Sequence, residues 1–126
     1  MFTIPRLAVV STHPIQYNAP LFRMLSQRRQ IALKVFYTRS ERIQGFVDKD
    51  FKREITWDIP LLDDYEYEVV ANQAANPGKS GFSSVNTPTL NAKIKMWEAD
   101  AVLVYGWNFL AHLSVMRYFH GKIPVL

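Results

Sequence analysis

The chain has 126 residues, enough for one domain core but too few for a complete multi-domain enzyme. Its composition, 48% hydrophobic and 21% charged, excludes intrinsic disorder, and the absence of cysteine excludes disulfides, thiolate metal sites and cysteine nucleophiles. The formal charge of +4 is spread along the chain, so we expect no nucleic-acid partner, and with no apolar run long enough to span a bilayer we expect a cytoplasmic protein.

The first 38 residues have the pattern of a strand, a helix and a second strand. Arg6–Ser11 is a short apolar run that ends at a polar, proline-containing segment, which is typical of a strand buried on both faces. Asn18, two residues before a proline, predicts a helix start, and Arg28 and Arg29 suit the negative end of that helix. The apolar face of this helix is expected to hold Leu21, Phe22, Met24 and Leu25. Residues 31–38 are again apolar and β-branched, which completes a β-α-β unit.

The middle of the chain is less regular. Residues 39–64 mix charges, aromatics and a proline, and they predict a long excursion from the sheet. Residues 65–70 resume as a strand, and residues 71–86 form a loop rich in Asn, Gly, Ser and Ala. Thr87 before Pro88 predicts the cap and the first position of a helix. The apolar face of that helix is expected to hold Leu90, Ile94 and Trp97.

The last part of the chain contains the strongest strand signal. Residues 101–105, Ala-Val-Leu-Val-Tyr, predict a central parallel strand that ends at Gly106. Asn108 is expected to cap a last helix that Gly121 terminates. The residues expected on its apolar face are Leu110, Leu113, Val115 and Met116. Residues 123–126 begin a further strand, so we expect the chain to be a truncated piece of a larger protein.

The alternation of strands and helices predicts an α/β, Rossmann-like fold with a mostly parallel sheet flanked by helices. Ligands of such sheets bind at the carboxyl ends of the strands, so the segments that follow the first strand and residues 101–105 are the candidate site. The first of these segments, residues 11–20, contains no glycine. Because a dinucleotide needs a glycine-rich loop to let the backbone approach its phosphates, dinucleotide binding is not expected.

The loop after the first strand is dense in neutral hydrogen-bonding groups, which suit sugar hydroxyls. The substrate-binding candidates in this loop are Thr12, Gln16, Tyr17 and Asn18. His13 is the catalytic candidate, because an imidazole titrates near neutral pH and can take a proton from an attacking hydroxyl. A structural interpretation stays open, in which His13 and Asn18 only satisfy the loop backbone and cap the helix.

Gly106 and Trp107 are the substrate-binding candidates at the second position. A glycine lets the backbone approach a ligand, and a tryptophan can stack on a sugar face. A plain strand-to-helix turn with a packed Trp is the open alternative. His112, one turn into the last helix, is expected to be a surface or partly packed residue rather than a ligand. The histidines at positions 13, 112 and 120 lack the spacing of helical zinc ligands, so we expect no metal and no other cofactor.

Three segments carry a family pattern when taken together. Residues 7–22 read Leu-Ala-Val-Val-Ser-Thr-His-Pro-Ile-Gln-Tyr-Asn-Ala-Pro-Leu-Phe, residues 51–62 read Phe-Lys-Arg-Glu-Ile-Thr-Trp-Asp-Ile-Pro-Leu-Leu, and residues 100–107 read Asp-Ala-Val-Leu-Val-Tyr-Gly-Trp. In this order they resemble the N-terminal half of bacterial family-4-type glycosyltransferases. These enzymes have the GT-B fold, in which two Rossmann-like domains face each other across the active site. The resemblance covers most of the chain and leaves residues 71–87 unmatched.

The resemblance implies transfer of a sugar from a nucleotide-sugar to an acceptor hydroxyl, with retention of configuration and without a metal. The chain would be the acceptor-side half, and its partners would be the nucleotide-sugar donor, a glycan or lipid-linked acceptor and its own C-terminal domain. In the family that domain carries two glutamates separated by seven residues. No such pair occurs in this sequence, so we expect the 126 residues alone to be inactive.

Some properties stay open at this level. The resemblance favours cell-surface glycan synthesis, whereas peripheral contact with a membrane and the oligomeric state are undecided. A non-catalytic α/β binding or interaction domain is the alternative from another class. The aromatic residues that motivate it are Phe46, Phe51, Trp57, Tyr65 and Tyr67.

Overall fold

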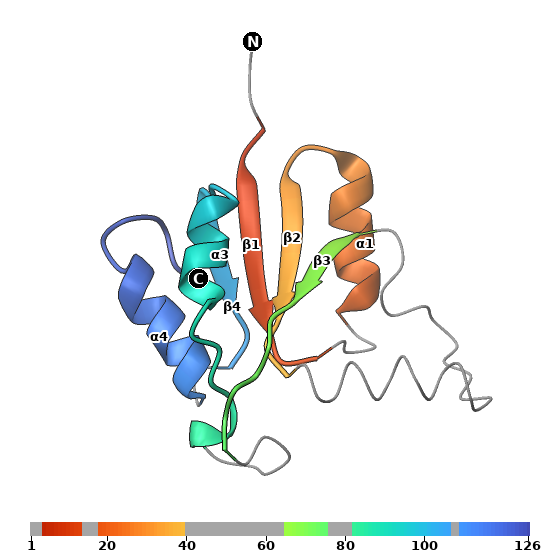
Figure 1. The fold of residues 1–126 in the computed structure, drawn as a ribbon. Coiled ribbons are helices and arrows are strands. Elements are labelled where there is room, and N and C mark those ends of the chain that lie inside the picture. Colours follow the sequence, from red (N-terminus) through yellow and green to blue (C-terminus); the bar gives the residue numbers. More distant parts are fainter. Residues whose placement is uncertain (1–3, 14–17, 40–64, 76–81, 107–108) are drawn as a thin grey trace, which may run out of the picture.

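The computed structural model of the chain describes residues 4–13, 18–39, 65–75, 82–106 and 109–126. Its sheet has four parallel strands in the order β3-β2-β1-β4 (Figure 1). They are β1 (Arg6–Ser11), β2 (Ala32–Tyr37), β3 (Glu66–Val69) and β4 (Ala101–Val104). The helical elements described are α1 (Ala19–Arg28), the 3-10 turn η1 (Phe82–Ser84), α3 (Leu90–Met96) and α4 (Leu110–Phe119). The prediction of a Rossmann-like α/β fold with a parallel sheet is confirmed.

The strands form where the sequence predicted them, within one residue at each end. β1, β2 and β4 are the apolar runs, whereas β3 reads Glu-Tyr-Glu-Val. β1 lies inside the sheet, because Val9 pairs with Val35 of β2 on one side and with Leu103 of β4 on the other. The last residues of the chain extend the pairing beyond β4, since the Leu126 amide donates to the Val102 carbonyl at 2.8 Å. The expected strand start at residues 123–126 is therefore present as a parallel bridge.

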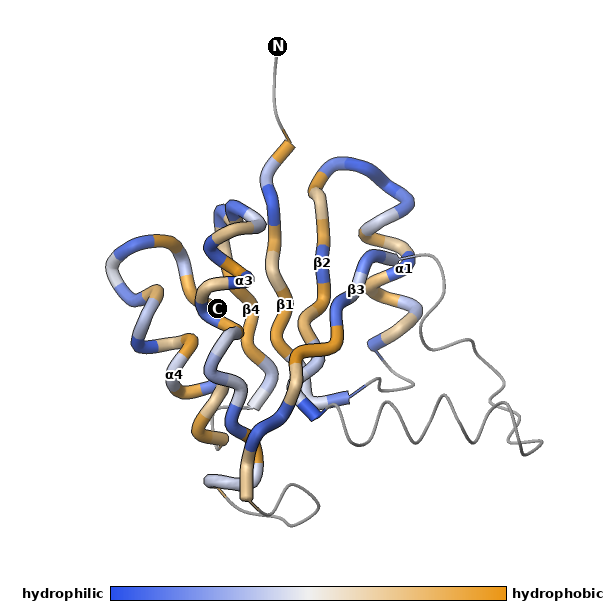
Figure 2. Tube along the Cα trace, viewed as in Figure 1, coloured by the Kyte–Doolittle hydropathy of each residue, from blue (hydrophilic) through white to orange (hydrophobic). Residues whose placement is uncertain are grey.

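Helices cover both faces of the sheet (Figure 1). Successive side chains of a strand point to opposite faces, so Val9 packs on the α1 side and Val10 on the side of α3 and α4. Apolar residues run along the strands, whereas the turn between α1 and β2 is hydrophilic (Figure 2). On the second face Ile94 is fully buried, and burying such a side chain contributes about 1.5–3 kcal/mol. The sheet is therefore the middle of three layers.

The predicted apolar faces of two helices are only partly correct. On α1, Phe22 is buried as expected, but Leu21 and Met24 are 39% and 45% exposed. On α4, Val115 is buried as expected, whereas Leu110 is exposed. The residues that α4 buries are Ala111, His112, Val115 and Phe119. α4 therefore buries His112 instead of Leu110. The buried ring finds its hydrogen-bond partners in polar groups at the end of the sheet.

The predicted caps agree with the structure in position at α1 and at the two helix ends, and differ at the start of α3. Asn18 is at the N-cap of α1 as expected, but its side chain makes no capping hydrogen bond. α3 begins at Leu90 with Thr89 at its N-cap, so the prediction that Thr87 caps this helix is wrong. Thr87 instead accepts a backbone hydrogen bond from the Leu90 amide in the preceding turn. Arg28 and Arg29 end α1, and Gly121 follows the end of α4 with a φ of 79°. The predicted cap of α4, Asn108, lies outside the described residues.

Candidate functional site

Buried polar side chains concentrate where the parallel strands end. Ser11 closes β1, Thr38 and Arg39 directly follow β2, and His112 lies in the first turn of α4. Each of these side chains is buried, as is Ser84 of η1, to which Arg39 donates a hydrogen bond. Burying polar groups costs free energy unless they form hydrogen bonds, so we expect each of these side chains to have a partner at this edge. We call Ser11, Thr38, Arg39, Ser84 and His112 the carboxyl-edge cluster.

The cluster lies at the topological switch point of the sheet. From β1 the chain continues to β2 and β3 on one side and later to β4 on the other side. In open α/β sheets, a binding crevice forms at this point beyond the carboxyl ends of the strands. The Tyr105 amide donates to the Val10 carbonyl at 2.9 Å, which keeps the ends of β1 and β4 side by side. Two predicted candidates, His13 after β1 and Gly106 after β4, therefore follow neighbouring strand ends.

Thr12 and His13 are held by their own side chains and by β2. Thr12 Oγ1 lies 2.8 Å from His13 Nδ1, and the Thr12 carbonyl accepts the Arg39 amide at 2.9 Å. Ser11 Oγ contacts the His13 carbonyl at 3.4 Å. His13 is half-buried, in contrast to the fully enclosed cluster beneath it. The predicted catalytic candidate thus has an orientation fixed by its neighbours and a partly open position.

His112 is the residue that sequence reasoning placed wrongly. It was expected at the surface or partly packed, but it is fully buried. Its Nδ1 lies 2.9 Å from both the Tyr105 and the Gly106 carbonyl oxygens, and its Nε2 lies 2.8 Å from Thr38 Oγ1. Burial lowers the pKa of His112 and the charge of Arg39 adds to this, although the hydrogen bonds to the carbonyls oppose it. The ring is therefore a neutral cross-link at neutral pH.

Arg39 brings a buried cation to the same edge. Its Nη2 donates to Ser84 Oγ at 2.9 Å, and its guanidinium lies 5.1 Å from the ring centre of Phe109, the N-cap residue of α4. The side chain of Asn72 fixes the other side of this region. Its Nδ2 donates to the Ser84 carbonyl at 3.0 Å, and its Oδ1 accepts a hydrogen bond from the Asn86 backbone amide at 2.9 Å. Two described parts of the predicted loop, residues 71–75 and 82–86, are thus joined to each other and to the carboxyl edge.

Gly106 has a backbone that favours glycine. Its φ of 82° lies in the left-handed region, which a side chain with a Cβ adopts only at a cost. The carbonyl of Gly106 accepts a hydrogen bond from His112 Nδ1, so both the backbone conformation and this hydrogen bond fix the turn after β4. The turn that follows β4 is therefore constrained at Gly106, and a role of this residue in binding a substrate stays a prediction.

The structure describes four of the seven predicted site residues. Thr12, His13 and Gly106 follow the adjacent ends of β1 and β4, and Asn18 is at the start of α1. Gln16, Tyr17 and Trp107 lie outside the described residues. Sequence reasoning missed Thr38, Arg39, Ser84 and His112. A signal for His112 existed, because it shares a helical face with Val115 and Phe119 at i, i+3 and i+7.

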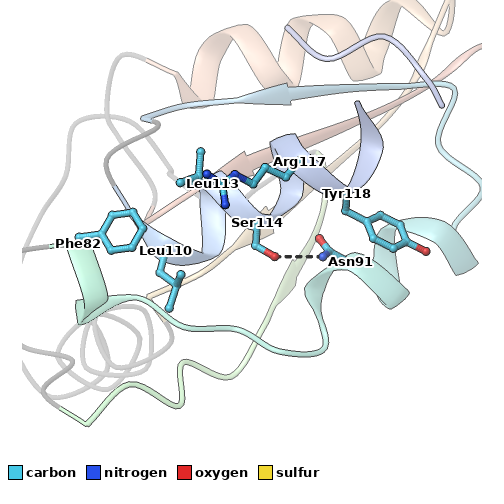
Figure 3. A pocket seen from close by; sticks show the side chains of 7 residues that line it. All are labelled: Phe82, Asn91, Leu110, Leu113, Ser114, Arg117 and Tyr118. Atoms are coloured by element: carbon cyan, nitrogen blue, oxygen red, sulfur yellow. Dashed lines mark hydrogen bonds between the residues drawn. The ribbon is translucent and has the colours of Figure 1, made fainter. Parts of the chain in front are cut away.

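A second feature is a hollow of about 610 Å³ lined by residues of α3, α4 and η1. In Figure 3, Phe82 and Leu110 lie toward one end of it and Tyr118 lies toward the other. Asn91 Nδ2 donates to Ser114 Oγ at 3.2 Å across it. Its lining is completed by Leu113 and Arg117. None of the predicted site residues that the structure describes lines this hollow.

Two further observations concern ligands and membranes. Among the residues that the structure describes, no three His, Asp or Glu side chains are grouped in a way that could hold a metal ion. Within the same ranges no helix has both the length and the apolar character needed to cross a bilayer.

The fold and the edge cluster define a Rossmann-like α/β domain with a polar layer at its switch point. Comparison of the chain with protein-family models, curated proteins and solved structures finds no match.

Proposed function

We propose that this chain is the acceptor-side, N-terminal half of a retaining glycosyltransferase of the GT-B type. In this proposal the protein works in the cytoplasm and moves a sugar from a nucleotide-sugar to an acceptor hydroxyl during cell-surface glycan synthesis. The carrying observation is the half-buried His13 imidazole, which Thr12 Oγ1 contacts at 2.8 Å at the switch point of a parallel sheet. The resemblance of residues 7–22 and 100–107 to that family supports the same assignment.

His13 would act as the base toward the acceptor. In the tautomer whose Nδ1–H donates to Thr12 Oγ1, the Nε2 lone pair can accept a proton. The acceptor hydroxyl would lose its proton to Nε2 as its oxygen bonds to the sugar carbon. The nucleoside diphosphate would leave from the same face of the sugar with the electron pair of the broken bond, so the configuration would be retained. General base catalysis of this kind is worth about 10²–10⁴ in rate.

Neutral groups around His13 would bind the sugar hydroxyls. Thr12 and Asn18 have side chains of this kind among the described residues, and the Asn18 amide is not used to cap α1. Gln16, Tyr17 and Trp107 belong to the proposal on sequence grounds alone. A second Rossmann-like domain would hold most of the nucleotide-sugar, so this half would contribute the acceptor and the base.

A sugar-transfer assay on the full-length protein, as its gene encodes it, tests the proposal. UDP-, GDP- and dTDP-sugars are offered with neutral oligosaccharides, and the products are analysed by NMR for the configuration at the new bond. The expected result is transfer with retention, with no activity from the 126 residues alone. The amide NMR shifts of residues 11–13 are also followed while the oligosaccharides are added to the protein. The proposal would be overturned if no donor–acceptor pair gives transfer or donor hydrolysis and these shifts stay unchanged.

The hollow beside α4 favours the alternative from another class. Phe82 is 47% exposed and Leu110 is 37% exposed, so this surface presents apolar side chains to solvent. A non-catalytic interaction domain would use such a surface. Light scattering that shows a tight dimer, with no thermal shift on adding nucleotide-sugars or oligosaccharides, would favour this alternative over sugar transfer.

A further inference from the structure

The imidazole of His112 connects three parts of the carboxyl edge. Its Nδ1 reaches the carbonyl oxygens of Tyr105 and Gly106 just after β4, and its Nε2 reaches Thr38 just after β2. Thr38 is in turn bound to β1, because its amide donates to the Ser11 carbonyl at 2.9 Å. One buried ring on α4 thus links the ends of β4, β2 and β1.

The partners of the ring identify the nitrogen that carries the proton. Carbonyl oxygens only accept hydrogen bonds, so Nδ1 must be protonated to bond with Tyr105 and Gly106. Nε2 of the neutral ring is then an acceptor, and the Thr38 hydroxyl donates a hydrogen bond to it at 2.8 Å. A threonine hydroxyl has one proton, so the 3.3 Å contact from Thr38 Oγ1 to the Ser11 carbonyl is not a second donated bond in this state.

We propose that His112 is a positioning residue for the site: its neutral Nδ1–H tautomer fastens the backbone at Tyr105 and Gly106 to Thr38, and so holds the segments on both sides of the switch point in register. The reaction that this serves rests on the proposed function, whereas the cross-link itself does not. The positioned groups are Gly106 on one side and, through Ser11 and the Arg39 amide, Thr12 and His13 on the other.

Two features keep the ring in this state. Burial opposes a charged imidazole, and the guanidinium of Arg39 contributes a positive charge that opposes a second one. Replacing the ring by an apolar side chain would leave the Thr38 hydroxyl and two carbonyls without this partner in a buried place. A histidine therefore suits this position because it can donate on one side and accept on the other.

Threonine substitutions provide matched tests. Thr38→Val removes the hydroxyl while keeping the shape of the side chain, and Thr38→Ser keeps the hydroxyl. Thr87→Val is the control, because Thr87 is also buried but its Oγ1 has no hydrogen-bond partner among the described residues. The readouts are the ¹⁵N spectrum of the His112 ring and the hydrogen exchange of three amides. Thr38 and Tyr105 report on the carboxyl edge, and Asp100, which donates to the Arg6 carbonyl at the opposite edge, is the reference.

The expected result is local. Thr38→Val should speed exchange of the Thr38 and Tyr105 amides by about ten-fold relative to Asp100, while Thr38→Ser and Thr87→Val change this ratio by less than about three-fold. The wild-type ring should carry its proton on Nδ1. Equal acceleration at Asp100, no acceleration at all, or a proton on Nε2 would each overturn the inference.

Sugar transfer separates this inference from the proposed function. In the protein as its gene encodes it, Thr38→Val should lower kcat by about ten-fold, and Thr38→Ser should restore it. If the wild-type protein transfers no sugar, the proposed function fails and the exchange experiment still decides the cross-link. If Thr38→Val and Thr87→Val transfer sugar as fast as the wild type, His112 does not position the site.

Discussion

Lys93 Nζ on α3 lies 2.6 Å from Glu68 Oε2 on β3, and the other oxygen of this carboxylate lies 3.0 Å from Lys34 Nζ on β2. One carboxylate thus joins the strand at the end of the described sheet to its neighbour and to the helix that covers it. Glu68→Gln should lower the free energy of unfolding by about 1 kcal/mol, because both cations lose their charged partner. Glu66→Gln is the control, since Glu66 is more exposed and lies 3.7 Å from Lys34, and it should change the free energy by less than about 0.5 kcal/mol in urea denaturation. Equal effects of the two substitutions would contradict the role given to Glu68.

The same carboxylate predicts a pH dependence. Burial alone would raise the pKa of Glu68, but hydrogen bonds from Lys93 and Lys34 and their charges outweigh it and lower the pKa below 4.5. The unfolded chain therefore binds the proton first as the pH falls, so the stabilisation is complete well above pH 4.5 and is lost as the pH falls from there through the folded pKa. The stability difference between the wild type and Glu68→Gln, measured from pH 7 to pH 3, should shrink in this range. A difference that stays constant to pH 3 would exclude the ion pairs as its source.

A buried pair of phenols lies under α1. Tyr37 Oη and Tyr65 Oη are 2.6 Å apart, and burial raises the pKa of Tyr37 far above its ordinary value. Tyr37→Phe should cost about 1–3 kcal/mol, because it leaves the Tyr65 hydroxyl without this partner. The double variant with Tyr65→Phe should cost less than the sum of the two single variants, because both substitutions remove the same hydrogen bond. Additive costs in thermal or urea unfolding would contradict a hydrogen bond between the two rings.

Two neighbouring arginines should respond to glycine in opposite directions. Arg29 ends α1 with a φ of 56°, a left-handed conformation that glycine adopts without steric cost. Arg29→Gly should therefore raise the free energy of unfolding by up to about 1 kcal/mol. Arg28→Gly, one residue earlier and inside the last turn, should lower it by about 0.5–1 kcal/mol. Chemical denaturation of both variants checks this, and a loss of stability in Arg29→Gly as large as in Arg28→Gly would contradict it.

Three of the described strands could be predicted because β1, β2 and β4 are short, largely apolar runs. Residues such as Val9, Val35 and Val102 are buried between two helical layers, so the run itself carries the signal. The helical faces were harder to predict, because hydropathy scored Leu21 and Met24 as core residues. The side of α1 that faces the sheet is set by where the chain crosses over it, which is a property of the tertiary structure.

The candidate site was predictable in place but not in composition. The carboxyl ends of β1 and β4 follow from the strand pattern, and His13 and Gly106 lie directly after them. Thr38, Arg39 and His112 come from elements far apart in the chain, and only the packing of α4 onto the sheet brings them together. The cap predicted at Thr87 was wrong although its local sequence is favourable. A threonine before a proline is a good N-cap, but the structure places the N-cap of α3 two residues later, at Thr89.

The central claim is that His13 takes part in sugar transfer. The most direct measurement is the kcat of transfer for His13→Ala in the protein as its gene encodes it, compared with His120→Ala. His120 is an exposed histidine at the far end of α4, so it controls for the loss of an imidazole as such. His13→Ala should lower kcat by about 10²-fold or more, while His120→Ala should leave kcat unchanged. Undiminished transfer by His13→Ala would contradict the claim.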